Sequence, residues 1–176
     1  MSGMGTAKKI QTTTDVLSIL TTQHEEVDQL FEKIETGKGD RSALFLELAD
    51  KLAAHASVEE KIFYPAVMGK QTDEQLHEAV EEHLQVKRLI ADMIALDVES
   101  DEFKAKLSVL KEDVSHHAHK EEEDKLFPIV RRNLSEDELA ALGNEVLATF
   151  EKLLPTHPHK MVPSETKKAA PLPPSA

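Results

Sequence analysis

The chain has 176 residues, a length that suits one domain with a substantial hydrophobic core, and its net charge is −12. Because so acidic a chain has no surplus of basic side chains, we expect neither a nucleic-acid partner nor binding to an anionic membrane surface. The sequence has no cysteine. That excludes disulfides, thiolate zinc sites, cysteine-ligated iron–sulfur clusters and haem attached through cysteine, so any metal ligand here must be His, Asp or Glu.

The two ends of the sequence differ in composition from the middle. Residues 1–13 are small and polar, which predicts a disordered lead, and they lack the apolar core of a signal peptide. Residues 155–176 hold six of the eight prolines and show no hydrophobic period, which predicts a disordered tail. We expect His157 and His159 to be part of this flexible tail, with opportunistic metal binding as the alternative. No apolar run approaches the roughly 20 residues that span a bilayer, so we expect a cytoplasmic protein.

The first predicted helix begins near Asp15 and ends before Gly37. Its apolar residues recur at alternating intervals of three and four, which predicts one buried stripe of an amphipathic helix. His24 lies on this stripe, and Asp40 is a candidate N-cap for the next helix. The stripe consists of Leu17, Leu20, His24, Val27, Phe31 and Ile34.

The second predicted helix follows Asp40 and closes at Gly69, with Pro65 allowing one more turn or a kink. His55 and Glu59 lie four residues apart on its buried stripe, so both side chains face the same way. An imidazole and a carboxylate placed like this can bind one metal centre together. We expect Phe63, Tyr64 and Phe127 to serve in packing.

The third and fourth predicted helices repeat this order. A capping-box pattern at residues 72–75 opens the third helix, which carries His83 on its stripe. After a short connection at 97–101, the fourth helix carries His117 in the same phase and continues beyond Pro128. His116 and His119 are off the stripe, since neighbouring helical positions differ by about 100°.

The carboxylate partner of His117 can be assigned in two ways. Glu121 lies four residues after His117, as Glu59 lies after His55, and we choose it as the ligand. Glu122 is the alternative because it lies six residues before Pro128, as Glu59 does before Pro65, and a local bulge would turn it inward.

A second capping-box pattern at 135–138 opens a fifth helix that ends near Leu154. Nothing in the sequence alternates as a strand would. Long helices with short connections predict an all-α fold, an antiparallel up-down-up-down four-helix bundle over residues 14–154 with the fifth helix at its C-terminal end.

Six polar side chains are thus predicted to point into the bundle core. Buried glutamate is costly without compensation, and a metal cation supplies that compensation, whereas structural hydrogen bonds among the six groups are the alternative. The predicted metal ligands are His24, His55, Glu59, His83, His117 and Glu121.

Four imidazoles and two carboxylates without sulfur suit iron, and less specifically manganese or zinc. Two carboxylates can bridge two cations, and six side chains leave coordination positions open. Open positions on a redox metal favour dioxygen, peroxide or nitric oxide as ligands. Two alternatives are a ferritin-like iron-handling protein, which would use Glu-x-x-His pairs rather than His-x3-Glu, and a metal-free or zinc-binding helical interaction module.

The order and spacing of these motifs resemble the hemerythrin-like family, specifically its bacterial His-His-Glu cation-binding branch, over about residues 15–132. The resemblance lies in residues 23–26, 55–65, 82–90 and 116–128. It implies an oxo- or hydroxo-bridged di-iron centre in a four-helix bundle, in proteins that bind dioxygen, sense oxygen or redox state, handle iron, or react with peroxide and nitric oxide.

One feature departs from the oxygen-carrying members of that family, which show two histidines a turn apart on the third helix. Here His83 has Ala79 one turn before it and Lys87 one turn after it. This difference favours sensing or detoxification over simple oxygen carriage.

Overall fold

The computed structural model of the protein describes residues 15–175, so the predicted disordered lead at 1–13 lies outside the described residues. Within that range every regular element is a helix, which confirms the all-α fold class. The long helices are α1 (Val16–Thr36), α2 (Arg41–Val58), α4 (Asp73–Ile94), α5 (Asp101–Ser115) and α7 (Glu136–Leu153).

Two of the predicted helices contain π-helical turns. Helix α2 continues through the π-helix η1 (Glu59–Phe63) into α3 (Tyr64–Val67), and α5 continues through the π-helix η2 (His116–Leu126) into α6 (Phe127–Asn133). Pro65 and Pro128 lie in the first turn of α3 and α6, where the missing N–H costs little. Each composite of three elements is therefore one continuous rod.

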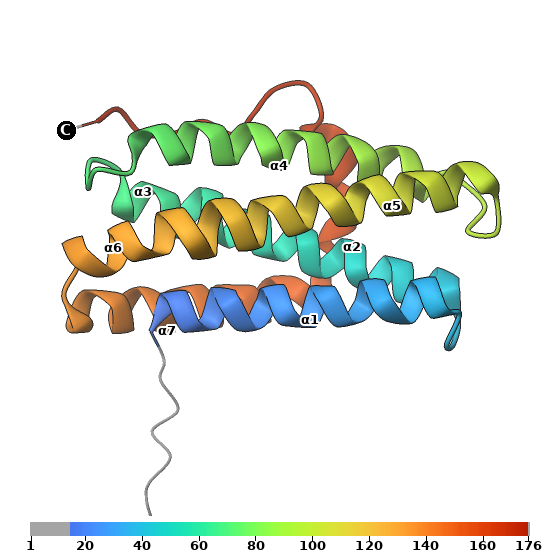
Figure 1. The fold of residues 1–176 in the computed structure, drawn as a ribbon, viewed down its shortest axis with the longest axis horizontal. Helices are drawn as coiled ribbons and strands as arrows, with labels where there is room; N and C mark the ends of the chain where they lie inside the picture. Colours follow the sequence, from blue (N-terminus) through green and yellow to red (C-terminus); the bar gives the residue numbers. More distant parts are fainter. Residues whose placement is uncertain (1–14, 176) are drawn as a thin grey trace, which may run out of the picture.

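The four rods, α1, α2–η1–α3, α4 and α5–η2–α6, alternate in direction and are joined by turns at the two ends of the molecule (Figure 1). Helix α7 follows the last rod and packs against α1 and α2. The arrangement is that of an antiparallel four-helix bundle with a fifth helix on one side.

Capping residues explain where the helices begin. The side chains of Asp15, Asp40 and Ser100 each accept a hydrogen bond from a backbone N–H of the first turn, and Ser135 with Glu138 forms the predicted capping box. The box predicted at 72–75 does not form, because the Thr72 hydroxyl donates to the Val67 carbonyl oxygen instead.

The core of the bundle is divided into two hydrophobic halves. One half includes Leu17, Phe63 and Val130, and the other includes Phe31 and Leu110. Each rod places one buried histidine between the two halves, so a polar layer crosses the middle of the bundle.

The C-terminal segment differs from the predicted disordered tail. Residues Leu154–Thr156 (η3) and Pro158–Glu165 (η4) form 3₁₀-helices, and η4 packs against α2 and α4. Pro158 and Val162 are buried there, and Arg88 donates from Nε to the Thr166 carbonyl oxygen at 2.9 Å. Prolines with fixed φ suit short turns of this kind, so a proline-rich composition is compatible with a packed segment.

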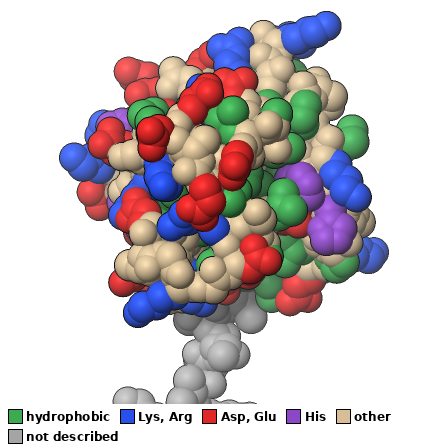
Figure 2. Space-filling view, turned by 90° about the vertical axis from the view of Figure 1, so that its right-hand side faces the viewer, with side chains coloured by type: hydrophobic (Ala, Val, Ile, Leu, Met, Phe, Trp, Pro, Cys, Tyr) green, Lys and Arg blue, Asp and Glu red, His purple; other side chains and the backbone are tan. Residues whose placement is uncertain are grey.

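Viewed from the end that lies on the right in Figure 1, the surface carries acidic and basic side chains interspersed with hydrophobic ones (Figure 2). Among the helices of residues 15–175, none combines the length and the apolar character that crossing a membrane requires.

Candidate metal centre

Five of the six predicted ligands meet in the polar layer between the two halves of the core. They come from all four rods, and each is at most 7% exposed. These five residues are His24, His55, Glu59, His83 and His117.

Glu122, rather than the predicted Glu121, completes the cluster. Glu122 is 1% exposed and its Oε1 lies 3.2 Å from His117 Nε2. Glu121 instead accepts a hydrogen bond from Lys125 at 2.9 Å and lies 3.3 Å from the exposed His116.

The π-helix η2 explains the change of residue. In an α-helix, two residues five positions apart, such as 117 and 122, point in directions about 140° apart around the axis. A π-helical turn contains about one residue more than an α-helical turn, so residues five positions apart lie on the same side of the helix. Glu122 lies five residues after His117, and the intervening backbone is π-helical.

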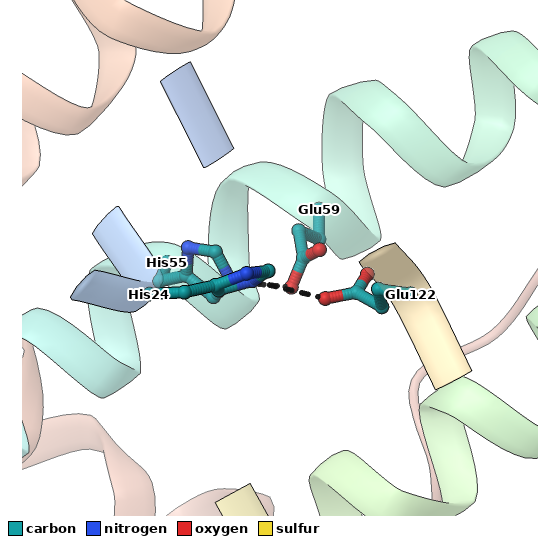
Figure 3. Close-up of side chains that lie close together, drawn as sticks. All are labelled: His24, His55, Glu59 and Glu122. Atoms are coloured by element: carbon teal, nitrogen blue, oxygen red, sulfur yellow. Dashed lines mark hydrogen bonds and ion pairs between the residues drawn. The ribbon is translucent and has the colours of Figure 1, made fainter. Parts of the chain in front are cut away.

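One half of the cluster is formed by His24 and His55. Their Nε2 atoms are 3.2 Å apart. Oε1 of Glu59 lies 3.0 Å from Nε2 of His55, and Oε1 of Glu122 lies 3.2 Å from Nε2 of His24. Figure 3 shows these four side chains converging on one point.

The other half repeats this arrangement with His83 and His117, whose Nε2 atoms are 3.0 Å apart. The same Glu59 oxygen lies 3.3 Å from Nε2 of His83, and the same Glu122 oxygen lies 3.2 Å from Nε2 of His117. Each carboxylate therefore contacts one histidine of each pair.

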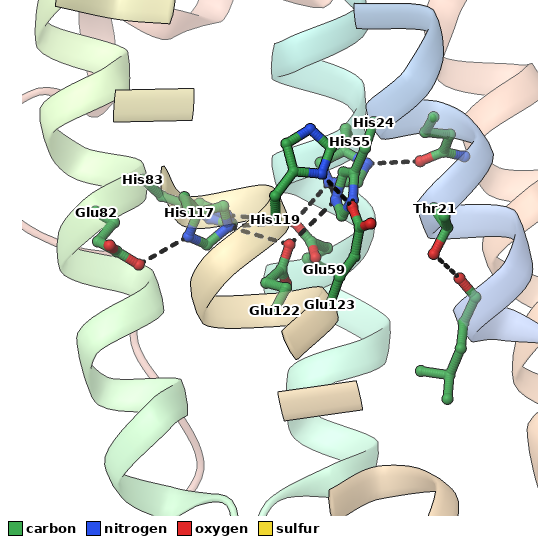
Figure 4. Close-up of polar contacts among 12 residues, drawn as sticks. Thr21, His24, His55, Glu59, Glu82, His83, His117, His119, Glu122 and Glu123 are labelled. Atoms are coloured by element: carbon green, nitrogen blue, oxygen red, sulfur yellow. Dashed lines mark hydrogen bonds and ion pairs between the residues drawn. The ribbon is translucent and has the colours of Figure 1, made fainter. Parts of the chain in front are cut away.

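Hydrogen bonds on the outer side of the rings set their protonation (Figure 4). Nδ1 of His24 is 2.6 Å from Glu123, and Nδ1 of His117 is 2.9 Å from Glu82. Nδ1 of His55 is 2.7 Å from the side-chain oxygen of Gln23. Because these oxygens are acceptors, each Nδ1 carries the proton, and a neutral ring then directs the lone pair of Nε2 into the cluster.

The cluster thus brings acceptors face to face. Both carboxylate oxygens of Glu59 and Oε1 of Glu122 are buried and have no hydrogen-bond partner. Converging lone pairs and carboxylates repel one another unless a cation lies between them. Separations of 3.0–3.3 Å between neighbouring atoms fit ligands that each lie about 2.0–2.2 Å from one ion. The residues present therefore fit a metal site.

Without a metal ion, protons on the histidines can supply positive charge to the cluster. Burial opposes the charging of His24, but the nearby carboxylates of Glu122 and Glu123 outweigh it and raise the pKa of His24 to about 9. Burial likewise opposes the charging of His117, whose pKa the Glu122 charge raises well above its ordinary value. The electrostatic environment thus favours positive charge.

Tyr64 also belongs to this site, although its sequence position indicated only a role in packing. Its hydroxyl donates to Oε2 of Glu122 at 2.9 Å and lies 3.3 Å from Nε2 of His83. Burial and the charges of Glu122 and Glu59 raise the pKa of Tyr64 well above its ordinary value, so the phenol keeps its proton and acts as a donor. The sequence feature that could have identified Tyr64 as a site residue is its position five residues after Glu59 and directly before Pro65, as the one tyrosine of the chain.

A cavity of about 40 Å³ lies beside the cluster, and its walls are mostly apolar. All four histidines of the cluster line it, together with Lys87 of α4 and Val162 of η4. Lys87 donates from Nζ to both carboxylate oxygens of Glu60, at 2.7 and 3.0 Å, and both side chains are buried.

His119 lies outside the cluster, as predicted, but connects it to the surface. Its Nδ1 donates to Glu123 at 2.8 Å, and Nε2 lies 2.8 Å from the exposed carboxylate of Asp28. Because Glu123 also accepts from His24, a line of contacts runs from Asp28 to a cluster histidine.

Comparison with known proteins supports the resemblance seen in the sequence. The family model described as "Hemerythrin HHE cation binding domain" matches residues 15–130, a range that includes every residue of the cluster. A hemerythrin HHE cation-binding domain-containing protein from Mycobacterium kansasii, known from its crystal structure, is similar with a TM-score of 0.71 and 23% identity. That likeness covers 84% of this chain and 91% of the other, and it shows the fold.

A curated protein from Nostoc sp., named a DNA nickase, is 26% identical over 141 residues. The match covers 79% of this chain and 40% of the relative, so the chain spans less than half the length of that protein.

Proposed function

Since the chain belongs to the hemerythrin HHE cation-binding domain family, we propose that its buried cluster holds two iron ions and that the loaded protein binds or reacts with dioxygen, peroxide or nitric oxide. The observation that carries this proposal is the sharing of Glu59 and Glu122 between two histidine pairs. Shared carboxylates of this kind are the usual means of holding two ions close together.

In this proposal, His24 and His55 are terminal ligands of one ion and His83 and His117 of the other. Glu59 and Glu122, which contact both histidine pairs, would be shared by the two ions. Nitrogen and carboxylate ligands without sulfur suit iron, with manganese or zinc as weaker candidates. When bound, the iron pair supplies redox electrons and open positions for a small ligand.

The side chains around the cluster have three tasks. Gln23, Glu82 and Glu123 hold the rings of their histidines in the tautomer that directs Nε2 inward. Tyr64 orients Glu122 and offers a proton-bearing group at the edge of the cluster. The hydrophobic halves on either side keep bulk water away.

The size of the cavity limits what can react. About 40 Å³ is enough for a diatomic molecule or peroxide and is far below the roughly 300 Å³ of a typical pocket for an organic ligand. Lys87 borders this space one turn along α4 from His83 and forms a buried ion pair with Glu60. Oxygen carriers of the family have two histidines a turn apart on this helix, whereas here Ala79 and Lys87 lie one turn from His83. We therefore favour oxygen or redox sensing, or detoxification, over simple oxygen carriage.

The two alternatives of other classes are less well supported. A metal-free interaction module leaves the facing lone pairs and carboxylates without compensation, and a ferritin-like protein would carry Glu-x-x-His pairs. The name of the Nostoc relative describes a protein more than twice as long as the matched region, and a net charge of −12 is unfavourable for binding a polyanion.

The test is to load the protein with ferrous iron without oxygen and to mix it, in separate stopped-flow runs, with dioxygen, hydrogen peroxide and nitric oxide. We expect a rapid spectral change with at least one of them, and no return of the ferrous spectrum when dioxygen is removed. Absence of a change with all three would contradict the proposed reactivity. A fully reversible response to dioxygen would identify a carrier instead.

A further inference from the structure

A second group of metal-binding side chains lies on the outside of the bundle, where the C-terminal segment crosses α2. Oδ2 of Asp50 is 2.9 Å from Nδ1 of His157, and Oδ1 is 2.6 Å from Nδ1 of His159. The backbone N–H of His159 also donates to Oδ1 at 3.1 Å. One donor atom from each of the three side chains lies within 4.8 Å of the other two.

This group shares no residue with the buried cluster and is open to solvent on one side. Asp50 is 7% exposed, and the side chain of His159 is 12% exposed. The His157 side chain, in contrast, is 60% exposed. An ion can therefore reach the group from solvent, and two of the three side chains are already held in place by packing.

We propose that Asp50, His157 and His159 form a second metal site, which binds one divalent transition-metal ion of the Zn²⁺ class and ties the C-terminal segment to α2. Two imidazoles and one carboxylate are a common ligand set for zinc and leave a coordination position to water. Mg²⁺ and Ca²⁺ prefer oxygen ligands throughout, so the site selects against them.

Binding requires a change of tautomer in the two rings and a small separation of the side chains to admit the ion. Without metal, Nδ1–H of each ring donates to Asp50. With metal, the proton moves to Nε2, the Nδ1 lone pair faces the ion, and the imidazole stays neutral. The Asp50 carboxylate already faces both rings, at 2.9 Å from Nδ1 of His157 and 2.6 Å from Nδ1 of His159, so it is placed to bind the same ion. The acidic surface of the chain further attracts cations.

The site lies at a point where it can hold the segment closed over the bundle. Val162 follows His159 by three residues and forms part of the wall of the cavity beside the buried cluster. An ion bound by Asp50 and both histidines joins residues more than 100 positions apart, so it stabilises the docked segment by its binding free energy.

The test uses iron-loaded protein, so that the buried cluster is filled before zinc is added. Equilibrium dialysis against Zn²⁺, with metal analysis of the protein, is compared between the natural chain, His157→Gln and His77→Gln. Glutamine at 157 can still donate a hydrogen bond to Asp50, so the segment stays docked. His77 is exposed on α4 and outside the group, which makes its replacement the matched control.

We expect one additional zinc per chain in the natural protein and in His77→Gln, and binding at least about tenfold weaker in His157→Gln. Excess Mg²⁺ should not displace the zinc. Equal zinc binding by the natural chain and His157→Gln would overturn the proposal.

A second measurement tests whether the bound ion holds the C-terminal segment against α2. The Lys160–Met161 bond lies within η4, next to the exposed Met161, and trypsin can cut after this lysine when the segment opens. Zinc should slow this cleavage in the natural protein and leave it unchanged in His157→Gln. The same cleavage rate with and without zinc in the natural protein would refute the tie between the segment and α2.

Discussion

The hydroxyl of Tyr64 donates a hydrogen bond of 2.9 Å to Oε2 of Glu122, and so joins two rods of the bundle at the polar layer. Both side chains are almost fully buried. Among residues 15–175, Tyr64 is the one donor to Glu122 apart from the histidines, and it fixes the carboxylate that contacts both histidine pairs.

We therefore expect Tyr64→Phe to keep the fold and weaken metal binding. The substitution retains the ring and removes only the donor to Glu122. Loss of a partner that orients a ligand typically lowers metal affinity by about 10–100-fold. Competition with a calibrated chelator measures this change, and Phe63→Tyr serves as a control for adding a hydroxyl nearby. An unchanged affinity in Tyr64→Phe would show that the hydroxyl does not orient Glu122.

The neighbouring glutamates of η2 provide a matched pair of variants. Glu122→Gln removes a shared carboxylate and should lower metal affinity by more than about 100-fold. Glu121→Gln alters a side chain that contacts Lys125 and His116 near the surface, and should change affinity by about twofold or less. Metal analysis after dialysis compares the two directly. A larger loss of metal affinity in Glu121→Gln than in Glu122→Gln would favour Glu121 as the ligand and contradict the π-helical register.

The stability of the metal-free protein should depend on pH through His24. Its pKa rises from 6.5 to about 9 on folding, so the stabilisation is fully present below pH 6.5 and is lost as the pH rises through 9. The pKa values of His83 and His117 are raised in the same direction. Urea unfolding of metal-free protein should show the free energy of unfolding falling by about 1–3 kcal/mol over this window.

Metal binding should show the opposite dependence on pH. A metal ion replaces the protons that His24, His83 and His117 hold, so apparent affinity rises from pH 6.5 to 9 and the loaded protein loses its metal in acid. Proton release on loading, followed with an indicator dye, checks the same exchange. A metal affinity independent of pH in this window would contradict it.

The buried ion pair of Lys87 and Glu60 makes a further prediction. Lys87→Met leaves the Glu60 carboxylate buried without its cation and should cost about 3–5 kcal/mol of stability. Lys87→Met combined with Glu60→Gln removes both charges and should recover most of that loss. Urea midpoints of the two variants measure the difference. Equal destabilisation by the single and double variants would show that the charge of Glu60 is not the cause.

Much of the bundle could be predicted from hydrophobic periodicity. The stripes of all four rods place His24, His55, His83 and His117 inward, because α-helical phase holds over each stretch before the cluster. That phase fails within η2, where a π-helical turn adds a residue, so counting four from His117 selects Glu121 instead of Glu122. The equal spacing of Glu59 and Glu122 before their prolines carried the correct register.

The remaining differences come from contacts that periodicity does not describe. Tyr64 follows the π-helix η1, whose wider turn changes the α-helical phase on which a sequence-based assignment relies. The C-terminal segment packs through Pro158 and Val162 and through the bonds of two histidines to Asp50, a residue more than 100 positions away. The proline content of this segment indicated disorder, because composition alone does not show which residues far away in the sequence a segment contacts.

The central claim is that one buried cluster holds two metal ions that share Glu59 and Glu122. Anomalous diffraction at the iron edge, from crystals of iron-loaded protein, tests it most directly. We predict two peaks inside the bundle, one beside Nε2 of His24 and His55 and the other beside Nε2 of His83 and His117, with both carboxylates between them. A single peak, or none among these residues in a fully folded bundle, would contradict the account.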